Sequence, residues 1–212
     1  MALAGASRRD EQTPVRDQGP RPTCAVFAVT AAHEWKSDNG LDLSEEWCLW
    51  SAKRLMPAIG EATTVAAGLD GITADGHALE ANWPYGSPAY PAQPPRKAAE
   101  EARKRPGRWK SLGLASIAEI RDGLDAGWAI ILSLRFVVDA WYRASGDGAV
   151  DAPPGERISG GHAVLAVGIT EDDEAIEFKN SWGADWGDGG YGYLTSTYWI
   201  RYGKCAYALE AA

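Results

Sequence analysis

Cys24 is the residue whose position most clearly suggests chemistry, because it stands where a Gly/Pro-rich loop meets an apolar stretch. The loop begins at Asp17, and a helix is predicted from Thr23 to Lys36. A thiol in the first turn of a helix lies at the positive end of the helix dipole, which favours the thiolate. The sequence therefore predicts a nucleophile, for which the chain must supply a base, an orienting group and an oxyanion donor.

Three histidines are available as the base. His33 lies on the same predicted helix as Cys24, roughly 13 Å further along its axis, and cannot reach the thiol. His77 lies in a polar Asp-Gly-His-Ala turn, for which a solvated or locally hydrogen-bonded role is expected. His162 follows two glycines and precedes the apolar run Ala163 to Val167, which places its ring at the mouth of a strand. We therefore predict His162 as the base.

A predicted hairpin brings an orienting group to this base. If the turn is centred on Glu171, Val164 pairs with Phe178, and His162 lies opposite Asn180. Alternation along the strands then puts His162 and Asn180 on the same buried face. The amide oxygen of Asn180 can accept the imidazole N–H, which fixes the tautomer and leaves the other ring nitrogen for the thiol.

Gln18 can complete the set. Its side-chain N–H and the backbone N–H of Cys24 are suited to hold the oxyanion of a tetrahedral intermediate. Taken alone, His162 would be read as a satisfied core histidine and Gln18 as an ordinary loop residue. Their joint presence with Cys24 and Asn180 favours the chemical interpretation.

Several motifs follow one another in a fixed order along the chain. They are Gln-x5-Cys, then Gly-His-Ala-Val, then Phe-Lys-Asn-Ser-Trp-Gly-x-x-Trp-Gly-x-x-Gly-Tyr from Phe178 to Tyr191, with shorter matches at Thr13-Pro14-Val15, Leu43-Ser44-Glu45 and Gly76 to Tyr85. The set resembles the papain-like cysteine peptidases over essentially a whole catalytic domain. The string that ends at Tyr191 is long and specific.

The resemblance implies an α+β fold in one domain over residues 1–212. A helical left lobe at about 12–105 would face a β-barrel-like right lobe at about 106–212 plus the N-terminal segment, with a peptide or protein substrate in the cleft between them. The roles it implies are Cys24 as nucleophile, His162 as base and then acid, Asn180 as its orienter, Gln18 as oxyanion donor and Trp182 as a cover over the His–Asn hydrogen bond. The reaction is acyl transfer through a thioester, with no metal or other cofactor.

Two other functions fit the same residues. One is a deamidase, amidase or transpeptidase that uses the same thioester chemistry. The other is a non-catalytic peptide-binding module on the same fold. The intact set of four chemical positions favours the peptidase.

The sequence also departs from the family pattern beside the nucleophile. Arg21-Pro22-Thr23 and Ala25 stand where the family usually has Cys-Gly-Ser and Trp, so a disulfide cysteine and a ring of the cleft floor are missing. Ser51 stands about where another disulfide cysteine is usual, and Cys205 has no evident partner. Cys48 and Cys205 are predicted to be buried small hydrophobes. We expect a disulfide-free protein.

The elements that must position these residues change in type along the chain. Helices are predicted at Ser44 to Met56, Thr63 to Thr73 and Ser116 to Ala126, with a solvated charged segment from Pro95 to Arg108, and strands at Ile130 to Leu134, Gly161 to Ile169, Ala175 to Lys179 and Tyr191 to Thr195. Helices first and strands second indicate an α+β protein with two differently built lobes.

Composition excludes other classes. Acidic residues outnumber basic ones, 29 against 21, and the formal charge of -8 disfavours nucleic-acid binding. No apolar run is long enough to span a membrane, and no signal peptide is visible. With three cysteines, an odd and sparse set, these features predict a cytoplasmic protein. No inhibitory prosegment is visible either, so we expect restraint by an inhibitory or regulatory protein partner, a narrow cleft or a parent polyprotein.

Overall fold

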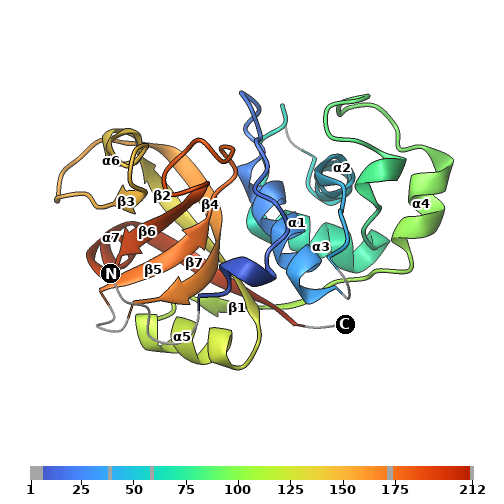
Figure 1. Cartoon of the computed structure of the whole chain (residues 1–212). Helices are drawn as coiled ribbons and strands as arrows, with labels where there is room; N and C mark the ends of the chain where they lie inside the picture. The colour runs from blue at the N-terminus through green and yellow to red at the C-terminus, as the bar shows by residue number, and fades with distance from the viewer. Residues whose placement is uncertain (1–6, 38–39, 58–59, 171–173, 211–212) are drawn as a thin grey trace.

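The structure is a computed structural model that describes residues 7–37, 40–57, 60–170 and 174–210. The α-helices of this part of the chain are α1 (Cys24–Lys36), α2 (Glu45–Leu55), α3 (Val65–Asp75), α4 (Arg96–Ala102), α5 (Ile117–Asp125), α6 (Val138–Arg143) and α7 (Ser196–Tyr202), with 3-10 helices η1 (Arg9–Glu11) and η2 (Glu80–Asn82). The strands are β1 (Arg108–Gly113), β2 (Ala129–Val137), β3 (Ala149–Val150), β4 (Ile158–Ile169), β5 (Ala175–Lys179), β6 (Tyr191–Thr195) and β7 (Gly203–Glu210). Figure 1 shows α1 to α4 gathered in one lobe and the sheet in the other, which confirms the predicted α+β, two-lobed fold.

Helix α1 lies at the centre of the helical lobe and forms part of its boundary with the sheet. Val26, Val29 and Ala32 are completely buried, and the helix packs against α2, α3, β2 and β4. A helix that is apolar all round is expected in such a central position. Its neighbours begin at side-chain caps, because Ser44 accepts a hydrogen bond in the first turn of α2 and Thr64 does the same for α3.

The sheet lobe contains one open, mixed sheet of seven strands. Their order is β1-β7-β2-β4-β5-β6-β3, and every pair is antiparallel except β3 with β6. Among its core residues are large rings, which include Trp141, Phe178 and Trp199. Strands β2 and β4 form the middle of the sheet and also face α1 of the other lobe. Residues on β4 are therefore held between the two lobes.

The pairing of β4 with β5 differs from the predicted register. The structure places Ala166, rather than Val164, opposite Phe178, and the ladder then shifts at an irregularity between Ala166 and Gly168. The predicted centre of the turn, Glu171, lies outside the described residues, as does Asn39 at the expected end of the first helix. A displacement by two residues keeps each side chain on its original face of the strand. The prediction that His162 and Asn180 share a face therefore does not depend on the register that was wrong.

His77 was expected in a solvated or locally bonded turn, and this prediction is wrong. The ring is completely buried, and its Nδ1 lies 3.0 Å from Nδ1 of His33, which is also buried. The carbonyl oxygen of Ser44 lies 3.1 Å from Nε2 of His77 and can only accept, so this nitrogen carries the proton in the neutral ring. His33 must then donate from Nδ1 to His77. Burial lowers the pKa of His33 to about 4 and that of His77 well below its usual value.

The N-terminal segment packs along the sheet lobe. The backbone N–H of Arg8 donates to the carbonyl of Val167 at 2.8 Å. The guanidinium of Arg9 forms an ion pair with buried Glu177 at 2.5 Å and lies 4.4 Å from the centre of the Tyr191 ring. These contacts attach the segment to β4, β5 and β6.

The three cysteines are all free thiols. Cys48 is completely buried, as predicted. Cys205 is half-buried rather than buried, because it lies on β7 with its Sγ 3.3 Å from the hydroxyl of Ser111 on β1, at the edge of the sheet. Within the described ranges, no helix combines the length and apolar character needed to cross a bilayer.

Candidate active site

Cys24 is the first residue of α1. The preceding residue, Thr23, makes no side-chain cap to this helix, and its hydroxyl lies 2.8 Å from that of Tyr85 instead. The first-turn N–H groups around the thiol are thus free of a side-chain cap. Burial raises the pKa of Cys24, while hydrogen bonding from the backbone N–H groups of Ala163 and Ala25 acts in the opposite direction. These N–H groups are placed to stabilise a thiolate once it forms.

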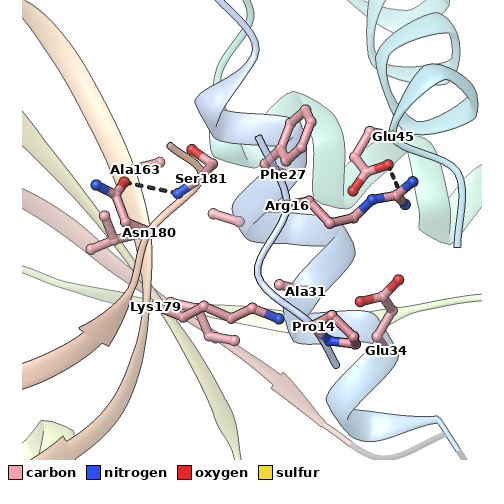
Figure 2. A pocket seen from close by; sticks show the side chains of 13 residues that line it. Pro14, Arg16, Phe27, Ala31, Glu34, Glu45, Ala163, Lys179, Asn180 and Ser181 are labelled. Atoms are coloured by element: carbon pink, nitrogen blue, oxygen red, sulfur yellow. Dashed lines mark hydrogen bonds and ion pairs between the residues drawn. The ribbon is translucent and has the colours of Figure 1, made fainter. Parts of the chain in front are cut away.

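His162 and Asn180 form a hydrogen bond, with 2.9 Å between His162 Nε2 and Asn180 Oδ1. The same Asn180 oxygen accepts the backbone N–H of Ser181, also at 2.9 Å, a bond that Figure 2 shows. Because this oxygen only accepts, Nε2 of His162 carries the proton in the neutral ring, and Nδ1 is left as an acceptor. Burial lowers the pKa of His162 to about 4, and the hydrogen bond that its ring donates to Asn180 opposes this shift.

Aromatic rings surround this pair on several sides. The Trp182 ring lies 4.8 Å from the His162 ring, and Trp141 approaches it edge-on at 4.7 Å. Phe136, at the end of β2, lies 5.9 Å from both His162 and Trp182. The rings therefore largely shield the hydrogen bond between His162 and Asn180 from water. Trp141 and Phe136 were not predicted, since nothing in their local sequence links them to a segment more than twenty residues away.

Gln18 connects the loop before Cys24 to the segment after Asn180. Its Nε2 donates to the carbonyl of Arg21 at 2.7 Å, and its Oε1 accepts from the hydroxyl of Ser181 at 2.7 Å. The backbone N–H of Gln18 also donates to the carbonyl of Ser181. An amide nitrogen has two N–H bonds, so the bond to Arg21 leaves one for another acceptor.

An open cavity of about 360 Å³ joins these residues. It is lined by Gln18, Pro22, Cys24, Ala25, Ala62, Thr63, Thr64, Val65, Ser133, Phe136, Gly161, His162, Ala163, Trp182 and Lys204. Four of the predicted residues, Cys24, His162, Gln18 and Trp182, line it together, and Asn180 lies behind His162. No hydrogen bond joins Cys24 to His162 among the described contacts. The described residues contain no cluster of three or more His, Cys, Asp or Glu side chains arranged to hold a metal.

Arg21 holds the loop before Cys24 against the helical lobe. Its guanidinium pairs with Glu46 at 2.7 Å and with Glu61 at 2.6 Å, and it lies 4.4 Å from the centre of the Tyr85 ring. Glu46 is completely buried and also accepts the backbone N–H of Gly86 at 2.9 Å. In the sequence Arg21 stands out only as a departure from the family pattern, because its partners come from distant segments.

A second, small cavity lies between the lobes on the other side of the Asn180 segment. Figure 2 shows that the side chains of Lys179, Arg16 and Glu45 line this cavity. Arg16 and Glu45 form an ion pair, with 3.0 Å between a guanidinium nitrogen and a carboxylate oxygen. The Lys179 ammonium donates to the carbonyl of Thr13 at 2.7 Å, and the Thr13 hydroxyl donates to Glu34. Burial raises the pKa of Glu45 to about 8 and lowers that of Lys179 to about 8. With a volume of about 20 Å³, this cavity has room for one water molecule.

Sequence comparisons find similar proteins along most of this chain. A relative from Acanthamoeba polyphaga mimivirus, described as an uncharacterized peptidase C1-like protein, is 29% identical over 198 residues, which cover 82% of this chain and 62% of the relative. Ananain from Ananas comosus is 26% identical over 211 residues, covering 93% of this chain and 56% of ananain. This chain thus spans about three fifths of the length of these relatives.

Solved structures show the same fold. The crystal structure of xylellain, a cysteine protease from Xylella fastidiosa, has a TM-score of 0.83 at 17% identity and covers 100% of this chain and 92% of that one. The Carica candamarcensis cysteine protease CMS1MS2, solved in complex with E-64, has a TM-score of 0.66 at 21% identity over 96% of this chain and 95% of that one. The family model described as papain family cysteine protease matches residues 6–211. The chain therefore belongs to the papain family of cysteine proteases.

Proposed function

We propose that this chain is a cysteine peptidase that hydrolyses peptide bonds through Cys24, His162 and Asn180. The observation that carries the proposal is one open cavity lined by both a thiol at a helix N-terminus and a histidine whose Nε2 is held by an asparagine oxygen. Nucleophilic catalysis by a thiol needs this combination of an activated nucleophile, a base and a group that orients the base.

Burial raises the pKa of Cys24 and lowers that of His162, so the transfer of a proton from the thiol to the ring needs support from neighbouring groups. As the sulfur attacks the substrate carbonyl, its proton passes to Nδ1 of His162, and the hydrogen bond to Asn180 helps to stabilise the imidazolium. The first turn of α1 favours the negative sulfur. Charge separation is therefore supported at both ends of the proton transfer.

The tetrahedral intermediate places a negative oxygen near the sulfur. We assign its stabilisation to the backbone N–H of Cys24 and the remaining N–H of Gln18, whose other N–H is held by the Arg21 carbonyl. Collapse of the intermediate breaks the C–N bond, and the amine leaves with the proton from His162. Water, activated by the same ring, then hydrolyses the thioester and restores the thiol.

The proposal has a direct chemical test in thiol labelling. Iodoacetamide, or an epoxide of the E-64 type, is expected to modify Cys24 much faster than Cys48 or Cys205 near neutral pH, as measured by mass spectrometry of digests. Cys205→Ala is the matched control, since it removes the other partly exposed thiol. Equal rates at all three sites, or an unchanged fast rate in His162→Ala, would contradict the assigned thiol–imidazole pair.

Turnover distinguishes the peptidase from the alternatives. A peptide library incubated with the purified chain is expected to yield new amino and carboxyl termini, which Cys24→Ala does not produce. Release of ammonia, or joining of peptides without hydrolysis, would instead indicate a deamidase or a transpeptidase. Binding without any product would indicate a peptide-binding module.

A further inference from the structure

One lysine side chain lines the active-site cavity among the described residues. Among the described residues that line it, Lys204 alone is a lysine, arginine, aspartate or glutamate. Much of the remaining lining is apolar, with Val65 contributed by the helical lobe and Phe136 and Ala163 by the sheet lobe. A substrate side chain that enters this space therefore meets one cation among mostly apolar and uncharged polar groups.

Lys204 occupies an irregular position at the start of β7. Its neighbours pair with β2, Gly203 with Leu134 and Cys205 with Ser133, and the register shifts between these pairs. Lys204 itself is skipped by the ladder, and bulges of this kind redirect a side chain relative to a regular strand. Lys204 is also solvent-exposed, and none of the ion pairs or hydrogen bonds found among the described residues uses its ammonium group.

An acidic residue adjacent in sequence to the cavity lining is already compensated. Glu61 precedes Ala62, which lines the cavity, but its carboxylate is bound by Arg21 at 2.6 Å. The chain as a whole carries a formal charge of -8, so its overall field repels an anionic peptide. A preference for an acidic residue must therefore come from Lys204 at short range.

We propose that Lys204 makes this cavity a binding subsite for an acidic side chain of a peptide substrate. A single ammonium on a flexible stem can reach a carboxylate without the fixed geometry that a guanidinium imposes. Apolar walls beside the pair reduce solvent screening and strengthen the attraction relative to open water. This inference rests on the proposed peptidase function and adds the chemical class of substrate.

The test compares peptides that differ at one position only. Fluorescence-quenched peptides carry Glu, Gln or Lys at each position in turn, and mass spectrometry of the products assigns the cleaved bond. At one position the native chain is expected to cleave the Glu peptide with a kcat/KM roughly fivefold above that of the Gln peptide at low salt, as for a partly exposed ion pair. This ratio is expected to fall toward one as the ionic strength increases.

Variants of Lys204 separate local charge from other effects. Lys204→Gln is expected to remove the Glu preference, Lys204→Arg to retain it, and Lys204→Glu to replace it by a preference for the Lys peptide. Lys97→Gln is the matched control, because it makes the same change in net charge at an exposed position on α4. This control is expected to keep the native Glu-to-Gln ratio.

The outcomes distinguish the two levels of the proposal. If the native chain cleaves none of the peptides, the peptidase function itself is refuted. If it cleaves them but the Glu-to-Gln ratio is the same in the native chain and in Lys204→Gln, the acidic subsite is refuted and the peptidase function stands. If Lys97→Gln also loses the preference for the Glu peptide, the preference depends on net charge, and the role of Lys204 is refuted.

Discussion

Replacing Arg21 by alanine tests how the loop before Cys24 is held. Arg21 bonds to Glu46 and Glu61 through its side chain, and its carbonyl accepts one N–H of Gln18. The substitution removes the ion pairs and frees the loop that carries this carbonyl. We therefore expect both the stability of the fold and the position of the proposed oxyanion donor to change.

The magnitude follows from the burial of Glu46. Removing one partner of a buried ion pair costs about 3–5 kcal/mol, because the other charge is left without compensation. Glu46 is completely buried but keeps backbone N–H donors from Gly86 and Tyr90, and the Arg21 side chain is 16% exposed. We therefore expect Arg21→Ala to lose unfolding free energy at the lower end of this range, about 3 kcal/mol.

The effect on catalysis is expected mainly in kcat. Gln18 would contact the oxyanion only after the sulfur has attacked, so its displacement raises the energy of the transition state more than that of bound substrate. Loss of an oxyanion donor lowers kcat by about a hundredfold or more, and we expect Arg21→Ala, which only loosens the donor, to lower it roughly tenfold. Arg21→Lys, which keeps the charge but not the paired geometry, should lie between the native chain and Arg21→Ala.

Urea unfolding in a Cys24→Ala background and steady-state kinetics on one peptide provide the two measurements. Arg54→Ala is the matched control, since Arg54 pairs with Asp75 at 2.7 Å but is 44% exposed and does not line the cleft. That control is expected to lose less than about 1 kcal/mol and to keep its kcat. If Arg21→Ala behaves like Arg54→Ala in both measurements, the assigned role of Arg21 is wrong.

Two further predictions concern the effect of pH. The hydrogen bond from His162 to Asn180 opposes the lowering of the His162 pKa, so Asn180→Ala should shift the acidic limb of kcat/KM to lower pH in a pH-rate profile; an unchanged limb would contradict this. Neutral His33, with a folded-state pKa of about 4, contributes stability that is present above its unfolded-state pKa and is lost as the pH falls toward 4. His33→Gln keeps an N–H donor for His77 but does not titrate, so between about pH 7 and pH 4 it should lose about 3 kcal/mol less unfolding free energy than the native chain. Equal acid destabilisation of both proteins in urea titrations would refute this assignment.

The His162–Asn180 pair shows why one part of the candidate site could be predicted from sequence. The predicted register of β4 against β5 was wrong by two residues, yet His162 and Asn180 meet at 2.9 Å. Side-chain direction in a strand repeats every two residues, so the prediction of a shared face did not depend on the pairing itself. The motif around Asn180 gave the same assignment independently.

Other features of the fold and the candidate site depend on contacts between distant segments. His77 has a polar local sequence but is buried, because it packs against His33 on α1 and bonds to the carbonyl of Ser44. Trp141, whose ring lies 4.7 Å from His162, comes from α6, a short helix that was not predicted. Such contacts are set by tertiary packing, and no local pattern in the sequence encodes them.

The free state of all three cysteines has a practical chemical consequence. The lobes are joined by packing, hydrogen bonds and ion pairs such as Arg16–Glu45, and no S–S bond contributes to their stability. A reducing agent can therefore keep the Cys24 sulfur in its thiol form without weakening any cross-link of the fold. In this protein, exposure to oxidants should modify Cys24 before it alters the scaffold, and thiol reductants should reverse the early oxidation products.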